Sequence, residues 1–179
     1  LLSPPDATLP SPPSPMAPEA GASSTVGSAH FVNEPAADFS RDDVRVAMAE
    51  AIDQVRKQLG QRLEVSRLNT HLPTGPDLRS FNPGQPEQLV GIVQSYLPAD
   101  VAGLLKVAES HAEEWKHRAV AERVAVMRKA ASLMREQRWE LAAWEVFEEA
   151  KPWREADADV AEAVDFLEYY AGEMEQLDP

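Results

Sequence analysis

Apolar side chains recur at intervals of three and four residues in five stretches of the chain, which is the spacing of amphipathic helices. Ser40 and Asp43 fit a capping box at the start of the first stretch, and Gly60 suits a left-handed stop at its end. Pro152 separates the last two stretches, because proline breaks a helix. The predicted helices are residues 41–59, 98–115, 120–134, 139–150 and 153–177.

The helical spacing is lost between the first two helices. Prolines and glycines mark turns throughout residues 61–89, so we predict mostly loop, with at most a short extended piece near residues 63–65. Residues 89–96 read LVGIVQSY, a β-branched run that predicts one strand, and a lone strand requires partners from elsewhere in the protein. The pattern predicts a mostly α fold with about five helices and one or two short strands.

The first 35 residues have a different composition from the rest. They hold 8 of the 15 prolines. Such a segment buries too little apolar surface to offset its ordering entropy, so we predict a disordered tail or linker at 1–35 and a folded part at 36–179. Overlapping P-x-x-P spacings that end at Pro18 fit a polyproline ligand, but the lack of a basic residue before Arg41 favours a plain spacer.

Charge and composition narrow the possible partners. The 17 Lys and Arg residues against 30 Asp and Glu residues give a net charge of −13, which disfavours binding to nucleic acid or to an anionic membrane. There is no cysteine, so these residues supply no disulfide and no thiol nucleophile. Without a long apolar run, or any basic residue before Arg41, we expect no membrane span and no secretory signal, and infer a cytoplasmic protein.

Few side chains have the spacing of a catalytic or metal site. The acidic residues Asp157, Asp159 and Glu162 lie in a helical pattern that lacks the glycine and the distant glutamate of a calcium loop. Neither common phosphate-binding glycine loop is present. The histidines form no ligand pair and are residues 30, 71, 111 and 117. We therefore assign no catalytic, cofactor-binding or metal-binding residue in this chain.

The last predicted helix carries a second face beside its apolar stripe. Glu162, Phe166 and Tyr169 follow one another at i, i+4 and i+7. Taken alone, these residues favour a solvated carboxylate next to half-buried aromatic side chains. The other interpretation is a contact or binding face, and composition does not decide between the two.

Several motifs resemble one known family. NEP at 33–35, DFS at 38–40, SFNP at 80–83 and LVG at 89–91 follow the order seen in the N-terminal part of aldehyde dehydrogenases of the L-glutamate γ-semialdehyde (1-pyrroline-5-carboxylate) branch. The stronger likeness lies in residues 138–174, with KPW at 151–153, ADVAEA at 158–163 and DFLEYYA at 165–171. The resemblance covers about residues 31–179.

The resemblance implies a fold and a function. Residues 36–179 would be the N-terminal portion of an NAD-binding domain in the α/β aldehyde dehydrogenase fold, cut before the cofactor sheet and the cysteine nucleophile. The intact enzyme would be an NAD-dependent homo-oligomer that oxidises the semialdehyde to glutamate in proline catabolism. Because the thiolate of that family attacks the aldehyde, this chain alone is expected to be inactive and to bind no NAD.

The resemblance also implies a substrate-binding site. In the family the glutamate of ADVAEA faces the aldehyde tunnel and meets the substrate ammonium group, which implies that role for Glu162 and places Phe166 beside the same tunnel. The chain departs from the family pattern at Ala150, where a glycine is usual, and at Glu145 and Glu149, where apolar residues are usual. The usual first hairpin is also poorly matched by residues 61–79.

Two alternatives stay open at this point. The Pro-rich segment suits a free terminus or a link to a preceding proline dehydrogenase domain, as in the bifunctional proline-utilisation enzymes. A stand-alone helical interaction protein derived from a dehydrogenase segment is the alternative from another class. In either case we expect the isolated chain to be helix-rich but oligomeric or poorly soluble, because helices shaped to pack on a missing sheet expose their apolar faces.

Overall fold

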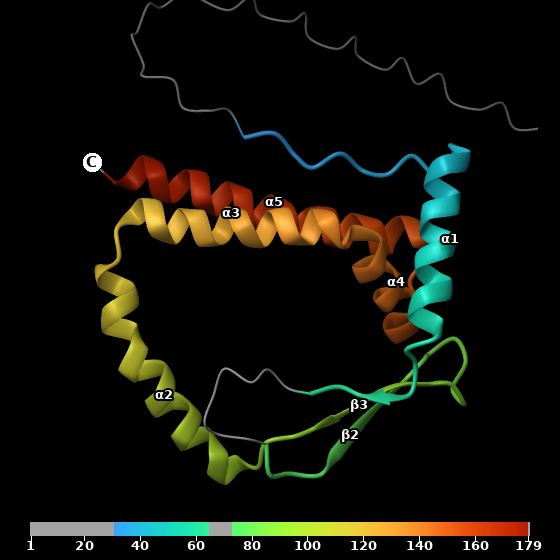
Figure 1. The fold of residues 1–179 in the computed structure, drawn as a ribbon, viewed down its shortest axis with the longest axis horizontal. Helices are drawn as coiled ribbons and strands as arrows, with labels where there is room; N and C mark the ends of the chain where they lie inside the picture. The colour runs from blue at the N-terminus through green and yellow to red at the C-terminus, as the bar shows by residue number, and fades with distance from the viewer. Residues whose placement is uncertain (1–30, 65–72, 179) are drawn as a thin grey trace, which may run out of the picture.

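The computed structural model describes residues 31–64 and 73–178, and it is mostly helical (Figure 1). The mostly α class is confirmed. The elements, in chain order, are α1 (Asp42–Arg56), β1 (Gln61–Arg62), β2 (Asp77–Phe81), β3 (Leu89–Gln94), α2 (Pro98–His117), α3 (Val120–Glu136), α4 (Arg138–Glu149) and α5 (Trp153–Leu177).

The strands form one small sheet in the order β1-β3-β2. β3 lies in the middle, with β1 parallel to it and β2 antiparallel to it. The predicted strand at residues 89–96 is confirmed, and it finds its partners within residues that we expected to be mostly loop. That expectation is wrong for β2, because β2 is mostly exposed and lies between Pro76 and Pro83, so neither an apolar run nor alternation reveals it.

The helix boundaries confirm the hydrophobic spacing but correct the expected cap. The hydroxyl of Ser40 donates to Asp38 at 2.7 Å and Asp43 pairs with Arg41, so among the described residues no side chain caps the start of α1. The capping-box prediction was wrong because α1 begins at Asp42, so Arg41 and not Ser40 occupies the N-cap position. Gly60 has φ = 77°, as the left-handed stop predicts, although α1 itself ends at Arg56.

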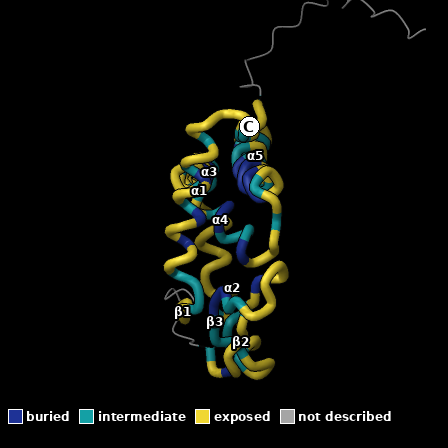
Figure 2. Tube along the Cα trace, turned by 90° about the vertical axis from the view of Figure 1, so that its right-hand side faces the viewer, coloured by how far each residue is buried: buried dark blue, intermediate teal, exposed yellow. Residues whose placement is uncertain are grey.

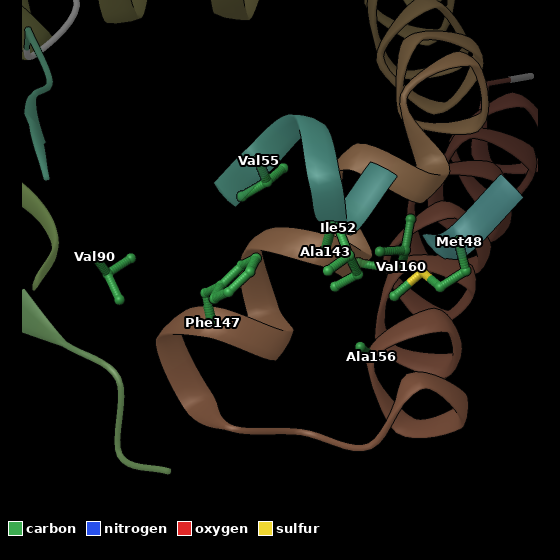
Figure 3. Close-up of a cluster of buried hydrophobic side chains, with 9 residues drawn as sticks. Met48, Ile52, Val55, Val90, Ala143, Phe147, Ala156 and Val160 are labelled. Atoms are coloured by element: carbon green, nitrogen blue, oxygen red, sulfur yellow. The ribbon is translucent and has the colours of Figure 1, made fainter. Parts of the chain in front are cut away.

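The main core forms where α1, α4 and the start of α5 meet (Figure 3). Phe147 of α4 belongs to this cluster, and Val90 of β3 extends it to the sheet. The remaining buried members are Met48, Ile52, Val55, Ala142, Ala143, Ala156 and Val160. Phe39, just before α1, lies 6.3 Å from the ring of Trp139 and 6.2 Å from that of Trp153, so the chain leading into α1 is fixed to the same cluster.

The second packing interface joins α3 and α5, which run side by side (Figure 1). Small and β-branched residues fill it, namely Val124, Ala131, Val164 and Ala171. By contrast, no residue of α2, all of which the structure describes, is buried (Figure 2). Among the described residues, no helix has both the length and the apolar character needed to cross a membrane.

Candidate functional site

The candidate site lies on α5, whose two faces have different environments. Ala156, Val160 and Val164 are buried against the neighbouring helices. Phe166 is 52% exposed and Tyr170 is 56% exposed on the opposite side. Pro152 sets the start of this helix in an extended conformation, and the next 25 residues continue without a break. The two faces predicted from the sequence are therefore present on one uninterrupted helix.

Glu162 lies exposed on this second face, one turn before Phe166. Within the part of the chain that the structure describes, its carboxylate makes no hydrogen bond and no ion pair. This distinguishes it from Asp157, Asp159 and Asp165 on the same helix, each of which binds a donor from another segment. Glu162 thus presents a negative charge that no cation among the described residues neutralises.

An aromatic row continues from Phe166 along the exposed face. The rings of Phe166 and Tyr170 are stacked, with their centroids 6.2 Å apart and their planes at 12°. Tyr169 meets Tyr170 edge-on at 5.4 Å, and Phe31 meets Tyr169 edge-on at 5.5 Å. A carboxylate beside aromatic faces suits an organic cation, since the charge and the ring quadrupole both attract an ammonium group.

The three aspartates of α5 have structural partners. Asp157 is 1% exposed and accepts hydrogen bonds from Arg138 Nε at 2.6 Å and Nη2 at 2.9 Å. Asp159 is paired with Lys151. Asp157, Asp159 and Glu162 are therefore not brought together as ligands. The ring nitrogens of His111 and His117 face backbone oxygens of their own helix, and the other two histidines lie outside the described residues.

A cluster around Lys151 was missed by the sequence reasoning. The ammonium group lies 3.1 Å from Glu145 and 2.8 Å from Glu149, and it also binds Asp159. The hydrogen bond from Lys151 holds the pKa of Asp159 below its usual range, whereas burial raises the pKa of Glu145. The two glutamates that depart from the family pattern thus share one cation. The one-turn spacing of Glu145 and Glu149 just before a lysine was the available signal.

The segment before α1 also contacts α5. Residues 31–35, which the sequence assigns to the tail, include Asn33 and Glu34, and both donate to the carboxylate of Asp165. Residues 1–30 lie outside the described residues, so the division of the chain at residue 35 stays a prediction. Two surface hollows, of about 590 Å³ against α1 and about 420 Å³ between α3 and α5, contain neither Glu162 nor Phe166.

Comparison with known proteins agrees with this fold. The model of the aldehyde dehydrogenase family matches residues 73–179. The chain belongs to that family. It is 37% identical over 147 residues to 1-pyrroline-5-carboxylate dehydrogenase 1 of Halalkalibacterium halodurans, and the match covers 82% of this chain and 28% of that protein. The likeness to the 1-pyrroline-5-carboxylate dehydrogenase branch, first suggested by the motifs, is confirmed.

Solved structures show the same relationship. A 1-pyrroline-5-carboxylate dehydrogenase variant of Thermus thermophilus superposes with a TM-score of 0.75 at 38% identity, over 79% of this chain and 28% of that one. Proline utilization A of Bdellovibrio bacteriovorus gives a TM-score of 0.80 at 33% identity, over 84% of this chain and 16% of that one. The chain therefore spans a little over a quarter of the length of the curated relatives it matches.

Proposed function

We propose that this chain forms the N-terminal part of an NAD-dependent dehydrogenase that oxidises L-glutamate γ-semialdehyde to glutamate in proline catabolism. The observation that carries the proposal is the exposed Glu162 carboxylate, which has no partner in the described residues and lies one turn from Phe166. The relatives named above are 1-pyrroline-5-carboxylate dehydrogenases, and they support the same substrate class.

In this proposal Glu162 binds the substrate ammonium group and Phe166 packs against its carbon chain. The carboxylate attracts an amino aldehyde and orients it, and the aromatic ring excludes water from one side of it. Neither residue takes part in bond making. The sequence has no cysteine, so a thiolate nucleophile has to come from outside these residues.

The start of α2 does not fit a dinucleotide phosphate. The junction between β3 and α2 has no glycine, and the carboxylate of Asp100 accepts from the backbone N–H of Leu97 at 2.7 Å, so a negative charge occupies the place of a phosphate. A Thermus relative was solved with NAD bound. We place the NAD site of the intact enzyme outside the described residues and expect the chain alone to form no NADH from the semialdehyde.

The remaining parts of the proposal concern the intact protein. We propose a cytoplasmic homo-oligomer, in line with the composition. The relatives include separate dehydrogenases and a proline utilization A protein, and both arrangements fit this chain. The alternative of a helical interaction protein accounts for the unburied α2. It does not account for the lack of a Glu162 partner within the described residues, or for the likeness of residues 138–174 to the dehydrogenases.

The test replaces Glu162 with glutamine in the full-length dehydrogenase that carries this chain. Glu162→Gln keeps the shape but removes the charge, so we expect KM for L-glutamate γ-semialdehyde to rise about 10- to 100-fold, which corresponds to a charge-assisted contact of about 1.5 to 3 kcal/mol. The KM for glutarate semialdehyde, which lacks the amino group, should barely change.

The matched control is Glu155→Gln, which removes a charge from the same side of α5 two turns earlier. It should leave both KM values unchanged. Equal losses for both aldehydes, or none for either, would return Glu162 to the solvated carboxylate favoured by composition alone.

A further inference from the structure

The stretch from Phe31 to Ala37, here called the strap, runs along α5 in the opposite direction (Figure 1). The backbone N–H of Ala37 donates to Asp157 Oδ2 at 2.9 Å. Eight residues further along α5, Asp165 receives the N–H of Glu34 on Oδ1 at 2.6 Å and the amide Nδ2 of Asn33 on Oδ2 at 2.7 Å. Two carboxylates about 12 Å apart along the helix axis therefore fix the direction of the strap.

Arginines of α3 and α4 hold the other side of the strap. Arg135 Nε lies 2.8 Å from Glu34 Oε2, and Arg135 Nη1 lies 2.8 Å from Glu168 Oε1 on α5. Arg138, whose side chain is 15% exposed, donates to the carbonyl of Pro35 at 2.9 Å while it binds Asp157. Charge-assisted bonds of this kind are stronger than neutral ones when they are shielded from water. The strap is thus clamped from both sides.

The strap ends at the aromatic row of the candidate site. Phe31 packs edge-on against Tyr169, Tyr169 against Tyr170, and Tyr170 stacks on Phe166. Asp165, the double acceptor, immediately precedes Phe166 in the sequence. The strap therefore reaches the Glu162 and Phe166 turn by two routes, through the helix backbone at Asp165 and through the row of rings.

We propose that the strap positions the substrate face of α5, with Asn33 and Asp165 as positioning residues for Glu162 and Phe166. The inference rests on the proposed function, because it assigns a purpose to the orientation of those two side chains. The side chain of Phe166 is about half exposed, so without the strap it would be mobile. Substrate binding would then have to immobilise this side chain, at a cost in conformational entropy. A clamped strap removes that requirement before the substrate arrives, and its loss weakens substrate binding more than turnover.

The test exchanges the two positioning side chains in the full-length dehydrogenase. Asn33→Asp sets two carboxylates against each other where the hydrogen bond is 2.7 Å long. Asp165→Asn leaves two amides, which still form a neutral hydrogen bond once the Asn33 amide turns over, so this variant removes only the charge of the acceptor. The double variant restores both hydrogen bonds. The new amide at position 165 still accepts from the N–H of Glu34, and it donates to the new carboxylate at position 33. We expect Asn33→Asp to raise KM for L-glutamate γ-semialdehyde about tenfold at nearly constant kcat, Asp165→Asn to raise it less, and the double variant to return it to within about twofold of the parent value.

A stability control separates positioning from mere stabilisation. Ile52→Val trims the core between α1 and α4, and Ile52 is not one of the residues that bind the strap. This variant should lower the melting temperature without changing KM. If Ile52→Val raises KM as much as Asn33→Asp at an equal loss of melting temperature, the positioning role is overturned. Failure of the double variant to restore KM also overturns it.

A second measurement separates this inference from the proposed function. Amide hydrogen exchange of residues 162–170 should speed up in Asn33→Asp and slow again in the double variant. If Glu162→Gln leaves KM for L-glutamate γ-semialdehyde unchanged, the proposed function is overturned, and with it the substrate-positioning role of the strap. If Glu162→Gln raises KM as proposed but Asn33→Asp leaves KM unchanged, the strap inference alone is overturned.

Discussion

The core of α1, α4 and α5 and the outlying helix α2 were predicted from the same kind of pattern, yet only the core is packed. Phe147 in that core is 6% exposed, whereas Leu105 on the apolar stripe of α2 is 58% exposed. The longer helix, of 20 residues against the 12 of α4, is the one that buries nothing. Hydrophobic spacing therefore specifies a helix, but burial depends on what lies opposite.

Local interactions explain how α2 holds its shape without a core. Glu114 and Arg118 pair at 2.8 Å, one turn apart, and Asp100 caps the backbone N–H of Leu97 at the start. Pairs of this kind stabilise a helix by a few tenths of a kcal/mol each, and the length of α2 supplies many turns. Its conformation is thus set locally, whereas the positions of α1, α4 and α5 are set by contact.

The largest test of this comparison truncates one aromatic side chain in each region. Phe147→Ala leaves a cavity in the core and should lower the free energy of unfolding by about 3 to 5 kcal/mol. Trp115→Ala on α2, where the side chain is 42% exposed, should lower it by less than about 1 kcal/mol. Urea titration followed by far-ultraviolet circular dichroism measures both. Similar losses would mean that α2 packs against something in solution.

The second test concerns the apolar stripe of α2. Val101, Leu105 and Trp115 are exposed on this helix, so we expect the isolated 179-residue chain to self-associate. Leu105→Lys should lower the mass measured by light scattering several-fold without lowering the melting temperature. Val126→Lys on α3, also exposed, serves as the control and should change the mass much less. A monomeric parent chain with one sharp melting transition would contradict the expectation.

How much of this the sequence predicts depends on the range of the interactions involved. The bounds of α5 at Trp153 and Leu177 follow from Pro152 and from a regular apolar stripe, which are local signals. β2 was missed because its hydrogen bonds to β3 are not local and its side chains are mostly exposed. The strap was missed for the same reason, since Asn33 and Asp165 are 132 residues apart.

The candidate site, too, could be predicted from the sequence only in its local features. The spacing of Glu162 and Phe166 on one helix face was visible in the sequence, because helical geometry fixes it. The absence of a partner for Glu162 among the described residues was not visible, since it depends on which cations the fold brings near. The neighbouring Asp159 looked equivalent in sequence and is paired with Lys151. Their roles in binding stay predictions.

The third test examines a smaller effect at the junction between α4 and α5. Ala150 has φ = 56°, the left-handed conformation that glycine adopts without strain. Ala150→Gly should therefore stabilise the chain by about 0.5 to 1 kcal/mol. Ala158→Gly at an exposed position inside α5 should destabilise it by about 1 kcal/mol. The same substitution should thus have opposite signs at two nearby positions, as read from urea midpoints, and equal signs would refute the strain at Ala150.

The smallest expected effect is the pH dependence of the Lys151 cluster, where the two carboxyl groups act in opposite directions. The lowered pKa of Asp159 means that its pairing stabilises the fold above the ordinary titration range of aspartate and that this contribution is lost as the pH falls. The raised pKa of Glu145 acts in the opposite direction. The folded state favours the protonated carboxyl, so protonation of Glu145 stabilises the fold as the pH falls. Lys151 stays charged throughout this range, since its pKa is raised.

Lys151→Gln should therefore make the fall in melting temperature between pH 6 and pH 3 shallower, by no more than about 2 to 4 °C for pairs this exposed. Glu145→Gln removes the carboxyl whose protonation stabilises the fold, so it should make the fall in melting temperature between pH 6 and pH 3 steeper. Scanning calorimetry of the three proteins in matched buffers compares the slopes, and changes of the same sign in both variants would show that Glu145 and Asp159 do not oppose one another.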